Sequence, residues 1–172
     1  MKRGERIITL TIAAAAVVLL WYVGSLNLIG KPAAVQASGI QLPELKSGEK
    51  VTVEFADKPT VISLFTSWCT YCNEDAPKMA ALHDKYKDRL NLIGVNITNR
   101  DYLPDVHSYV ERHSLTYPIL LDETGDIYQQ YGGSGFPALY FVNKDGKVVD
   151  AIIGSTDLET LDASFQRLLE NS

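Results

Sequence analysis

Hydrophobic residues change their spacing along the chain, and each spacing predicts an element. Residues 61–65 form a short apolar run that is typical of a buried strand. In the segment that follows, hydrophobic residues recur every three or four positions, which predicts an amphipathic helix with one buried face. The residues of this face are Ala76, Met79, Leu82, Tyr86 and Leu90.

The same two patterns continue to the end of the chain. We expect strands at residues 92–97, 117–121, 138–142 and 148–153, and helices at 102–113, 126–131 and from Thr156 onward. Residues 143–146 contain an Asp-Gly pair that favours a hairpin between the last two strands. Thr156 and Glu159 fit the capping box that begins a helix. Near the start, residues 43–53 contain two extended pieces around a Ser-Gly turn, which predicts a small hairpin.

This order of elements predicts the fold class. Strands that alternate with helices, followed by a hairpin and a closing helix, are typical of an α/β fold. Parallel strands need helical crossovers, whereas a tight hairpin adds antiparallel strands. We therefore expect a central mixed sheet flanked by helices.

The beginning of the chain differs from the rest. Residues 7–23 are almost continuously apolar, and about 20 such residues span the hydrocarbon core of a bilayer. Three basic residues ahead of this run favour a cytoplasmic N-terminus. We expect a cytoplasmic stub and one transmembrane signal-anchor helix over residues 1–30, a tether over 31–40 and one domain over 41–172. The alternative is a cleaved signal peptide, with residues 35–37 as a loose cleavage site.

Both alternatives place the domain outside the cytoplasm. The charge of the domain then indicates which kind of molecule it binds. The chain has 16 basic and 21 acidic residues. Without Lys2, Arg3, Arg6 and Glu5 the counts are 13 and 20, a net charge of −7. An acidic domain binds nucleic acid poorly, so we expect protein partners and no nucleic acid.

Cys69 and Cys72 are the only cysteines of the chain, and they lie where the first predicted strand gives way to a helix. The N-terminus of a helix stabilises a thiolate through its dipole and its unpaired N–H groups. The second sulfur follows almost one turn later, within reach of a disulfide. A disulfide that closes so short a loop stabilises a fold little. We therefore interpret the pair as a redox couple rather than a structural staple.

Residues 65–72 (FTSWCTYC), Pro77 and residues 135–137 (GFP) ahead of an apolar strand resemble the thioredoxin superfamily. The leading apolar segment, the hairpin and the helix inserted between the second and third strands are more similar to its bacterial, membrane-anchored TlpA/ResA-type branch. The resemblance covers about residues 41–170. It implies a thioredoxin-like fold and a thiol-disulfide oxidoreductase that is anchored by a single pass in the cell membrane, with its catalytic domain outside.

The resemblance also implies roles for individual residues. Cys69 is the attacking thiolate, and Cys72 is the more buried resolving thiol. Pro137 follows a cis peptide bond and packs beside the disulfide, and the backbone of Phe136 pairs with an extended substrate segment. We expect Trp68 to pack beside the sulfur and shield it, the alternative being an ordinary buried aromatic residue.

Three further residues are candidates for tuning the site. Asp75 follows Cys72 by three positions on the same helical face, and could accept the proton of the resolving thiol. The alternative for Asp75 is an acid of the first helical turn that complements the dipole. Thr70 and Tyr71 are expected to tune the pKa of Cys69. Ser63 stands where thioredoxins proper carry a buried aspartate, which argues against a general cytosolic thioredoxin.

The branch implies a reductant for exported proteins with cysteine pairs, such as apocytochrome c during cytochrome c maturation. We find no nucleotide, flavin or haem motif and expect no cofactor and no metal site, so electrons would arrive from a membrane thiol-disulfide donor. A disulfide oxidase or isomerase for exported proteins is the alternative. A copper chaperone and a thiol peroxidase, the latter indicated by Thr66 three residues before Cys69, are less favoured.

Overall fold

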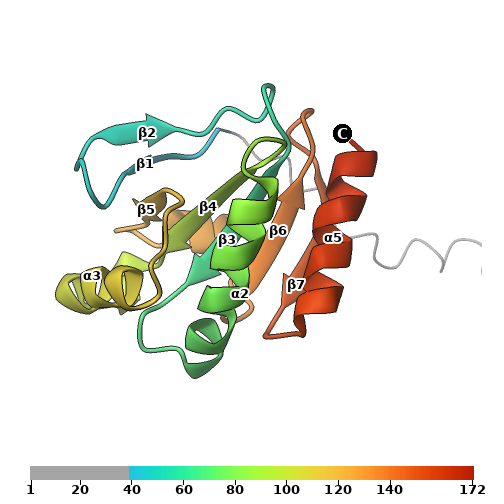
Figure 1. Cartoon of the computed structure of the whole chain (residues 1–172). Helices are drawn as coiled ribbons and strands as arrows, with labels where there is room; N and C mark the ends of the chain where they lie inside the picture. The colour runs from blue at the N-terminus through green and yellow to red at the C-terminus, as the bar shows by residue number, and fades with distance from the viewer. Residues whose placement is uncertain (1–38) are drawn as a thin grey trace, which may run out of the picture. The chain divides into compact units, whose positions relative to one another are not determined.

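A five-stranded mixed sheet organises the domain in the computed structural model, which describes residues 39–172 (Figure 1). Its strands are β3 (Thr60–Phe65), β4 (Asn91–Asn96), β5 (Ile119–Leu121), β6 (Ala138–Val142) and β7 (Val148–Ile153). In space they follow the order β5-β4-β3-β6-β7. The first three strands are parallel, and β6 and β7 are antiparallel to their neighbours. The predicted mixed sheet with a terminal hairpin is confirmed.

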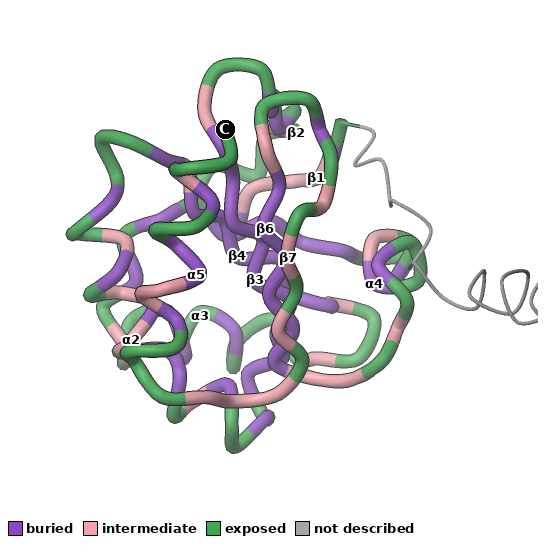
Figure 2. Tube along the Cα trace, turned by 90° about the vertical axis from the view of Figure 1, so that its right-hand side faces the viewer, coloured by how far each residue is buried: buried purple, intermediate pink, exposed green. Residues whose placement is uncertain are grey.

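Helices cover both faces of this sheet. They are α2 (Thr70–Tyr86), the short 3₁₀ helix η1 (Thr98–Arg100), α3 (Leu103–Arg112), α4 (Asp126–Gln130) and α5 (Leu158–Glu170). α2, α3 and α5 lie on one face and α4 on the other (Figures 1 and 2). Two separate hydrophobic clusters, one for each face, fill the space between sheet and helices.

The burial of the central strand β3 explains why its residues are apolar at successive positions. All six of its residues are buried. Val61 and Phe65 enter the cluster beneath α2, α3 and α5, whereas Ile62 and Leu64 enter the opposite cluster. A strand covered on both faces needs apolar residues at successive positions rather than at alternate ones. This double burial holds the carboxyl end of β3 in place, and α2 starts just beyond it.

A small antiparallel hairpin, β1 (Gln41–Pro43) and β2 (Lys50–Thr52), lies against the β5 edge of the sheet. The backbone N–H of Leu45 donates to the carbonyl of Ile119 at 2.8 Å. Ile40, the last residue of the expected tether, is fully buried, and its carbonyl accepts a hydrogen bond from Val53. Ile40 therefore packs as part of the domain core.

The expected signal-anchor and most of the tether lie outside the described residues. Within residues 39–172, no helix is both long enough and apolar enough to cross a membrane.

The beginning of α5 corrects one expectation. Its N-cap is Asp157, whose carboxylate accepts hydrogen bonds from the backbone N–H and the hydroxyl of Thr160, each at 2.8 Å. The capping box predicted to start at Thr156 is therefore wrong by one residue. A charged carboxylate is a stronger acceptor at the positive end of a helix than a hydroxyl, so the aspartate takes this position.

Gly94 of β4 gives a test of the packing beneath α3. A methyl group added there would lie 2.6 Å from Cδ1 of Ile119 and 3.3 Å from the rings of Phe65 and Tyr117. We expect Gly94→Ala to lower the free energy of unfolding by about 1–3 kcal/mol in urea denaturation, because the core must shift to admit it. Gly39→Ala is the control, since its nearest contacts would be at 3.8 Å. Equal stability of both variants would contradict this picture of the core.

Candidate active site

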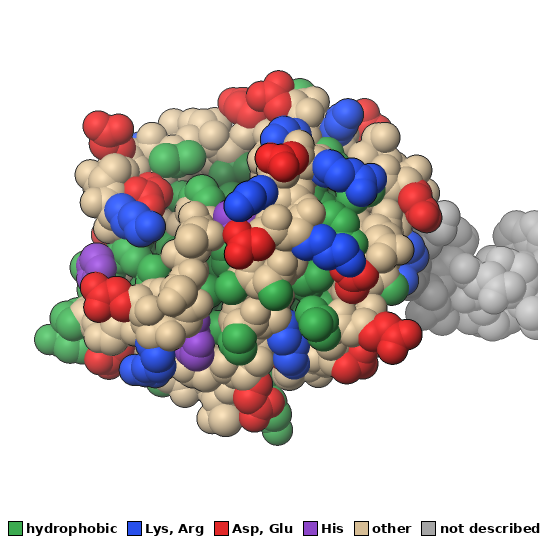
Figure 3. Space-filling view, in the orientation of Figure 1, with side chains coloured by type: hydrophobic (Ala, Val, Ile, Leu, Met, Phe, Trp, Pro, Cys, Tyr) green, Lys and Arg blue, Asp and Glu red, His purple; other side chains and the backbone are tan. Residues whose placement is uncertain are grey.

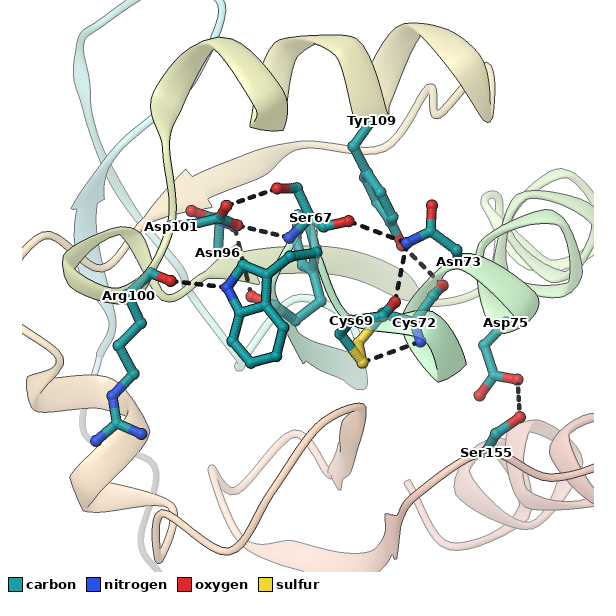
Figure 4. The surroundings of a disulfide bond; sticks show 12 residues. Ser67, Cys69, Cys72, Asn73, Asp75, Asn96, Arg100, Asp101, Tyr109 and Ser155 are labelled. Carbon is teal, nitrogen blue, oxygen red and sulfur yellow. Dashed lines mark hydrogen bonds between the residues drawn. A yellow bond between two sulfur atoms is a disulfide. The ribbon is translucent and has the colours of Figure 1, made fainter.

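Cys69 and Cys72 form a disulfide at the N-terminus of α2, with their Cα atoms 5.2 Å apart (Figure 4). Cys69 is the N-cap of the helix, and its sulfur accepts a hydrogen bond from the backbone N–H of Cys72 at 3.2 Å. The predicted placement at a strand-to-helix junction is confirmed. Cys69 is 7% exposed and Cys72 is 2% exposed. Cys69 is thus the more accessible cysteine, and the N–H of Cys72 would also stabilise its thiolate.

The carboxylate of Asp101 holds the loop that precedes Cys69. Its Oδ2 accepts from the backbone N–H of Ser67 at 2.6 Å and from the amide of Asn96 at 2.7 Å. Its Oδ1 accepts from the hydroxyl of Ser67 at 2.5 Å and from the N–H of Tyr102 at 2.9 Å. Hydrogen bonds to a charged acceptor are stronger than neutral ones. The end of β4 and the segment after η1 therefore fix the backbone two residues before the attacking cysteine.

Asn73 holds the other side of the same loop. Its Nδ2 donates to the carbonyls of Ser67 and Cys69, each at 2.9 Å. Its Oδ1 lies 2.9 Å from Nε2 of His113, which donates in the tautomer that carries hydrogen there. Burial and the neighbouring Arg112 charge lower the pKa of His113, so the ring is neutral at pH 7. The contact links the C-terminal end of α3 to the active-site loop.

Asp75 is buried on the same face of α2 as Cys72, as predicted. Both residues line a cavity of about 10 Å³ that Pro137 also lines, close to the space needed by one water molecule. Oδ1 of Asp75 accepts from Lys78 at 2.7 Å and from the hydroxyl of Ser155. Oδ2 is buried and has no hydrogen-bond partner within residues 39–172.

The alternative interpretation of Asp75 is wrong. The first turn of α2 holds no acidic residue, because the helix begins at Thr70 and Asp75 lies in its second turn. The dipole acts mainly on the first turn, so it does not account for a buried carboxylate at this position.

Tyr109 of α3 reaches the same cavity. Its hydroxyl donates to the carbonyl of Cys72 at 2.9 Å, and its ring stacks on Phe65. Burial and the nearby Asp75 charge raise the pKa of Tyr109. The hydroxyl therefore stays protonated and remains a donor to the backbone of the second cysteine.

Trp68 is 63% exposed, which excludes the alternative of an ordinary buried aromatic residue. Its Nε1 donates to the carbonyl of Arg100 at 2.8 Å, and its ring meets Phe136 edge-on at 6.2 Å. The peptide bond between Phe136 and Pro137 is cis, as the resemblance implies.

Two more of the site residues expected from the sequence lie at the surface, like Trp68. Thr70 is exposed at the start of α2, and Tyr71 is 58% exposed. Their role in tuning Cys69 stays a prediction. Ser63 of β3 is buried and lines the cavity shared by Cys72 and Asp75.

The sequence patterns did not indicate Asp101, Asn73 or Tyr109 as site residues. Asp101 lies 34 residues from Ser67, and Tyr109 lies 37 residues from Cys72, so no local spacing could reveal their contacts with the cysteine loop. Asn73 directly follows the second cysteine, and its position at the start of a predicted helix was a usable signal. Asparagine side chains there commonly bind nearby backbone groups.

Comparison with known proteins agrees with this geometry. Residues 33–151, more than half of the chain, match the model of the family described as AhpC/TSA. The chain belongs to the AhpC/TSA family. This member is 26% identical to sporulation thiol-disulfide oxidoreductase A of Bacillus subtilis, over 91% of this chain and 94% of the relative. It is 28% identical to thiol-disulfide oxidoreductase ResA of Bacillus cereus, over 98% of this chain and 99% of the relative.

The fold of this AhpC/TSA protein is also that of a solved relative. The crystal structure of StoA from Bacillus subtilis superposes with a TM-score of 0.66 at 24% identity, covering 75% of this chain and 97% of that one. The predicted thioredoxin-like fold is confirmed. The protein is a thiol-disulfide oxidoreductase of the ResA/StoA type with a Cys-x-x-Cys pair.

The Asp101 contacts predict a large effect of one substitution. Asp101→Ala leaves the amide of Asn96 and the N–H of Ser67 without their acceptor in a mostly buried place. We expect the free energy of unfolding to fall by about 3 kcal/mol in urea denaturation. Asp88→Ala removes an exposed carboxylate at the far end of α2 and should change stability by less than about 0.5 kcal/mol. If the two variants were equally stable, Asp101 would not hold the loop.

Proposed function

We propose that the protein is a membrane-anchored reductase that opens disulfides in exported proteins on the outer side of the cell membrane. The observation that carries this proposal is the Cys69–Cys72 pair at the N-terminus of α2, beside the cis bond of Pro137. The apolar run at residues 7–23 supports the anchor and the extracytoplasmic location. Apocytochrome c during cytochrome c maturation is the client that the TlpA/ResA resemblance favours.

The reaction transfers two electrons through two exchange steps. The Cys69 thiolate attacks one sulfur of the client disulfide, so a Cys69–client bond forms, the client S–S bond breaks and one client thiolate leaves. The Cys72 thiolate then attacks the sulfur of Cys69 and expels the second client thiolate. The products are the Cys69–Cys72 disulfide and a reduced client, whose thiolates take up the two protons given up by the protein's cysteines.

Asp75 supports the second step. A resolving thiol attacks only as a thiolate, and Cys72 is almost fully buried. Asp75, whose Oδ2 is buried without a partner in the described residues, lines the cavity that Cys72 also lines. In our proposal this oxygen accepts the thiol proton, directly or through one water molecule.

The surroundings of the pair favour a protein client. The backbone ahead of Pro137 is available for an extended segment that adds to it as a strand does. On the face shown in Figure 3, basic and acidic side chains are interspersed rather than gathered into a basic patch. Re-reduction of the disulfide then requires a thiol donor, which we place in the membrane.

Asp75→Asn tests the proton transfer. We expect release of a client from its mixed disulfide with Cys69 to slow about 100-fold at pH 7, measured by stopped-flow single turnover. The rate should recover as the pH rises above the ordinary pKa of a thiol, about 8.5, because even a buried Cys72 then ionises without a proton acceptor.

Glu74→Gln is the matched control, because Glu74 is the exposed neighbour of Asp75. It should keep the wild-type rate. An equal loss for Asp75→Asn at every pH would mean that Asp75 only ties α2 to Ser155 and takes no part in proton transfer.

The reduction potential tests the direction of electron flow. We expect a value near the −270 mV of thioredoxin, measured in glutathione or dithiothreitol redox buffers. A value near −120 mV would instead identify an oxidase.

Trapping of clients tests the location. Cys72→Ala should accumulate mixed disulfides with exported proteins in cells, and Cys69→Ala should accumulate none. Trapping of cytoplasmic proteins alone would contradict the location.

A thiol peroxidase is the second candidate, favoured by one observation. The hydroxyl of Thr66, three residues before Cys69, is buried and has no hydrogen-bond partner in the described part of the chain. The peroxidase function would be supported if the reduced protein consumed hydrogen peroxide rapidly and the Cys69→Ser variant did not. A copper chaperone has less support, since residues 39–172 contain no group of three metal-ligating side chains.

A further inference from the structure

A row of stacked side chains runs along one side of the disulfide. Trp68 meets Phe136 edge-on at 6.2 Å, and Phe136 stacks on Tyr128 of α4 at 4.9 Å. The guanidinium of Arg100 lies over the ring of Tyr128, 4.8 Å from its centroid. The row thus joins the cysteine loop to the residue before the cis-proline, and ends at a positive charge on η1.

The backbone of Arg100 and the ring on which its side chain lies are held in place before any client binds. Its backbone N–H donates to Ile97 at 2.9 Å, and its carbonyl accepts from the indole of Trp68 at 2.8 Å. The hydroxyl of Tyr128 donates to the carbonyl of Gly133 at 2.7 Å, which holds the ring beneath the guanidinium. A guanidinium stacked on an aromatic face loses little further freedom when it binds a ligand.

The charge of Arg100 is not neutralised by the described part of the chain. Arg100 is exposed, and the ion pairs of residues 39–172 all involve other cations. The neighbouring carboxylate of Asp101 is already taken by Ser67, Asn96 and Tyr102. Figure 4 shows the Arg100 side chain extending away from Asp101. Its forked N–H groups therefore face solvent beside the cis-proline loop.

We propose that Arg100 determines client specificity by binding a carboxylate of the segment that flanks the client's reactive cysteine. An extended segment on the backbone before Pro137 runs past Phe136, and Arg100 lies two ring contacts farther along. The fork of a guanidinium matches both oxygens of a carboxylate. The domain as a whole is acidic, so an acidic side chain gains from a position where it reaches this cation.

This inference rests on the proposed function, since its occupant is a protein client that forms a mixed disulfide with Cys69. The exchange is the one already described: the Cys69–client bond forms as the client disulfide breaks. Arg100 touches neither sulfur and acts only on the choice of client. An oriented but solvent-exposed ion pair of this kind is worth about a threefold to tenfold preference in rate.

The test uses the reduced full-length chain and a set of disulfide-containing peptides. Each peptide carries one Asp at one position within three residues of the cysteine, and is paired with the same peptide carrying Asn or Lys there. We expect the wild-type protein to exchange with the Asp peptide about three to ten times faster than with the Asn peptide at one or more positions. Arg100→Gln should abolish this ratio, and Arg100→Glu should favour Lys instead.

Two further variants control for charge and geometry. Arg89→Gln removes the same charge from an exposed site beyond the C-terminal end of α2, so it should keep the wild-type ratio. Arg100→Lys keeps the charge without the planar fork and should retain part of the preference. A retained preference in this variant would also show that the effect does not come from misfolding.

Equal Asp-to-Asn ratios for the wild type and Arg100→Gln would overturn the inference. A potential near −120 mV would overturn the reducing direction alone, because a mixed disulfide forms in both directions and the ratio still reports on Arg100. Absence of exchange with every peptide would overturn both proposals.

Discussion

The short loop between β3 and α2 depends on one half-buried carboxylate. Asp101 accepts four hydrogen bonds, two of them from Ser67, so the chain between Phe65 and Cys69 has one position rather than several. Because this position puts Cys69 at the N-cap of α2, the sulfur receives the N–H of Cys72. The redox chemistry therefore relies on an acidic residue that takes no part in it.

The two faces of the sheet contribute differently to the site. The face beneath α2 and α3 supplies Tyr109 and the cavity that Cys72 shares with Asp75. The opposite face supplies α4, whose Tyr128 supports Phe136. The disulfide lies where these two sets of contacts meet. In our proposals, proton transfer is therefore governed from one side of the sheet and client choice from the other.

Local patterns were sufficient for the elements and for the cysteines. The apolar run at residues 61–65 predicted β3 correctly because both faces of that strand are buried. The position of Cys69 and Cys72 between this run and the helical pattern correctly predicted that they lie at the start of a helix. Neighbouring cap-forming residues made the start of α5 ambiguous, and Asp157 took the place expected for Thr156. The contacts of Asp101 and Arg100 depend on tertiary packing. A single sequence carries no local trace of such pairings.

The β1–β2 hairpin has a consequence for how the chain folds. It covers the β5 edge by pairing Leu45 with Ile119, two residues far apart in the sequence. Contacts of such long range form late, since the loop between them must first be closed. Until then the β5 edge offers free N–H and C=O groups to any other unfolded chain. The unfolded or partly folded protein is therefore prone to self-association at this edge. In the folded domain, the hairpin covers the edge and prevents it.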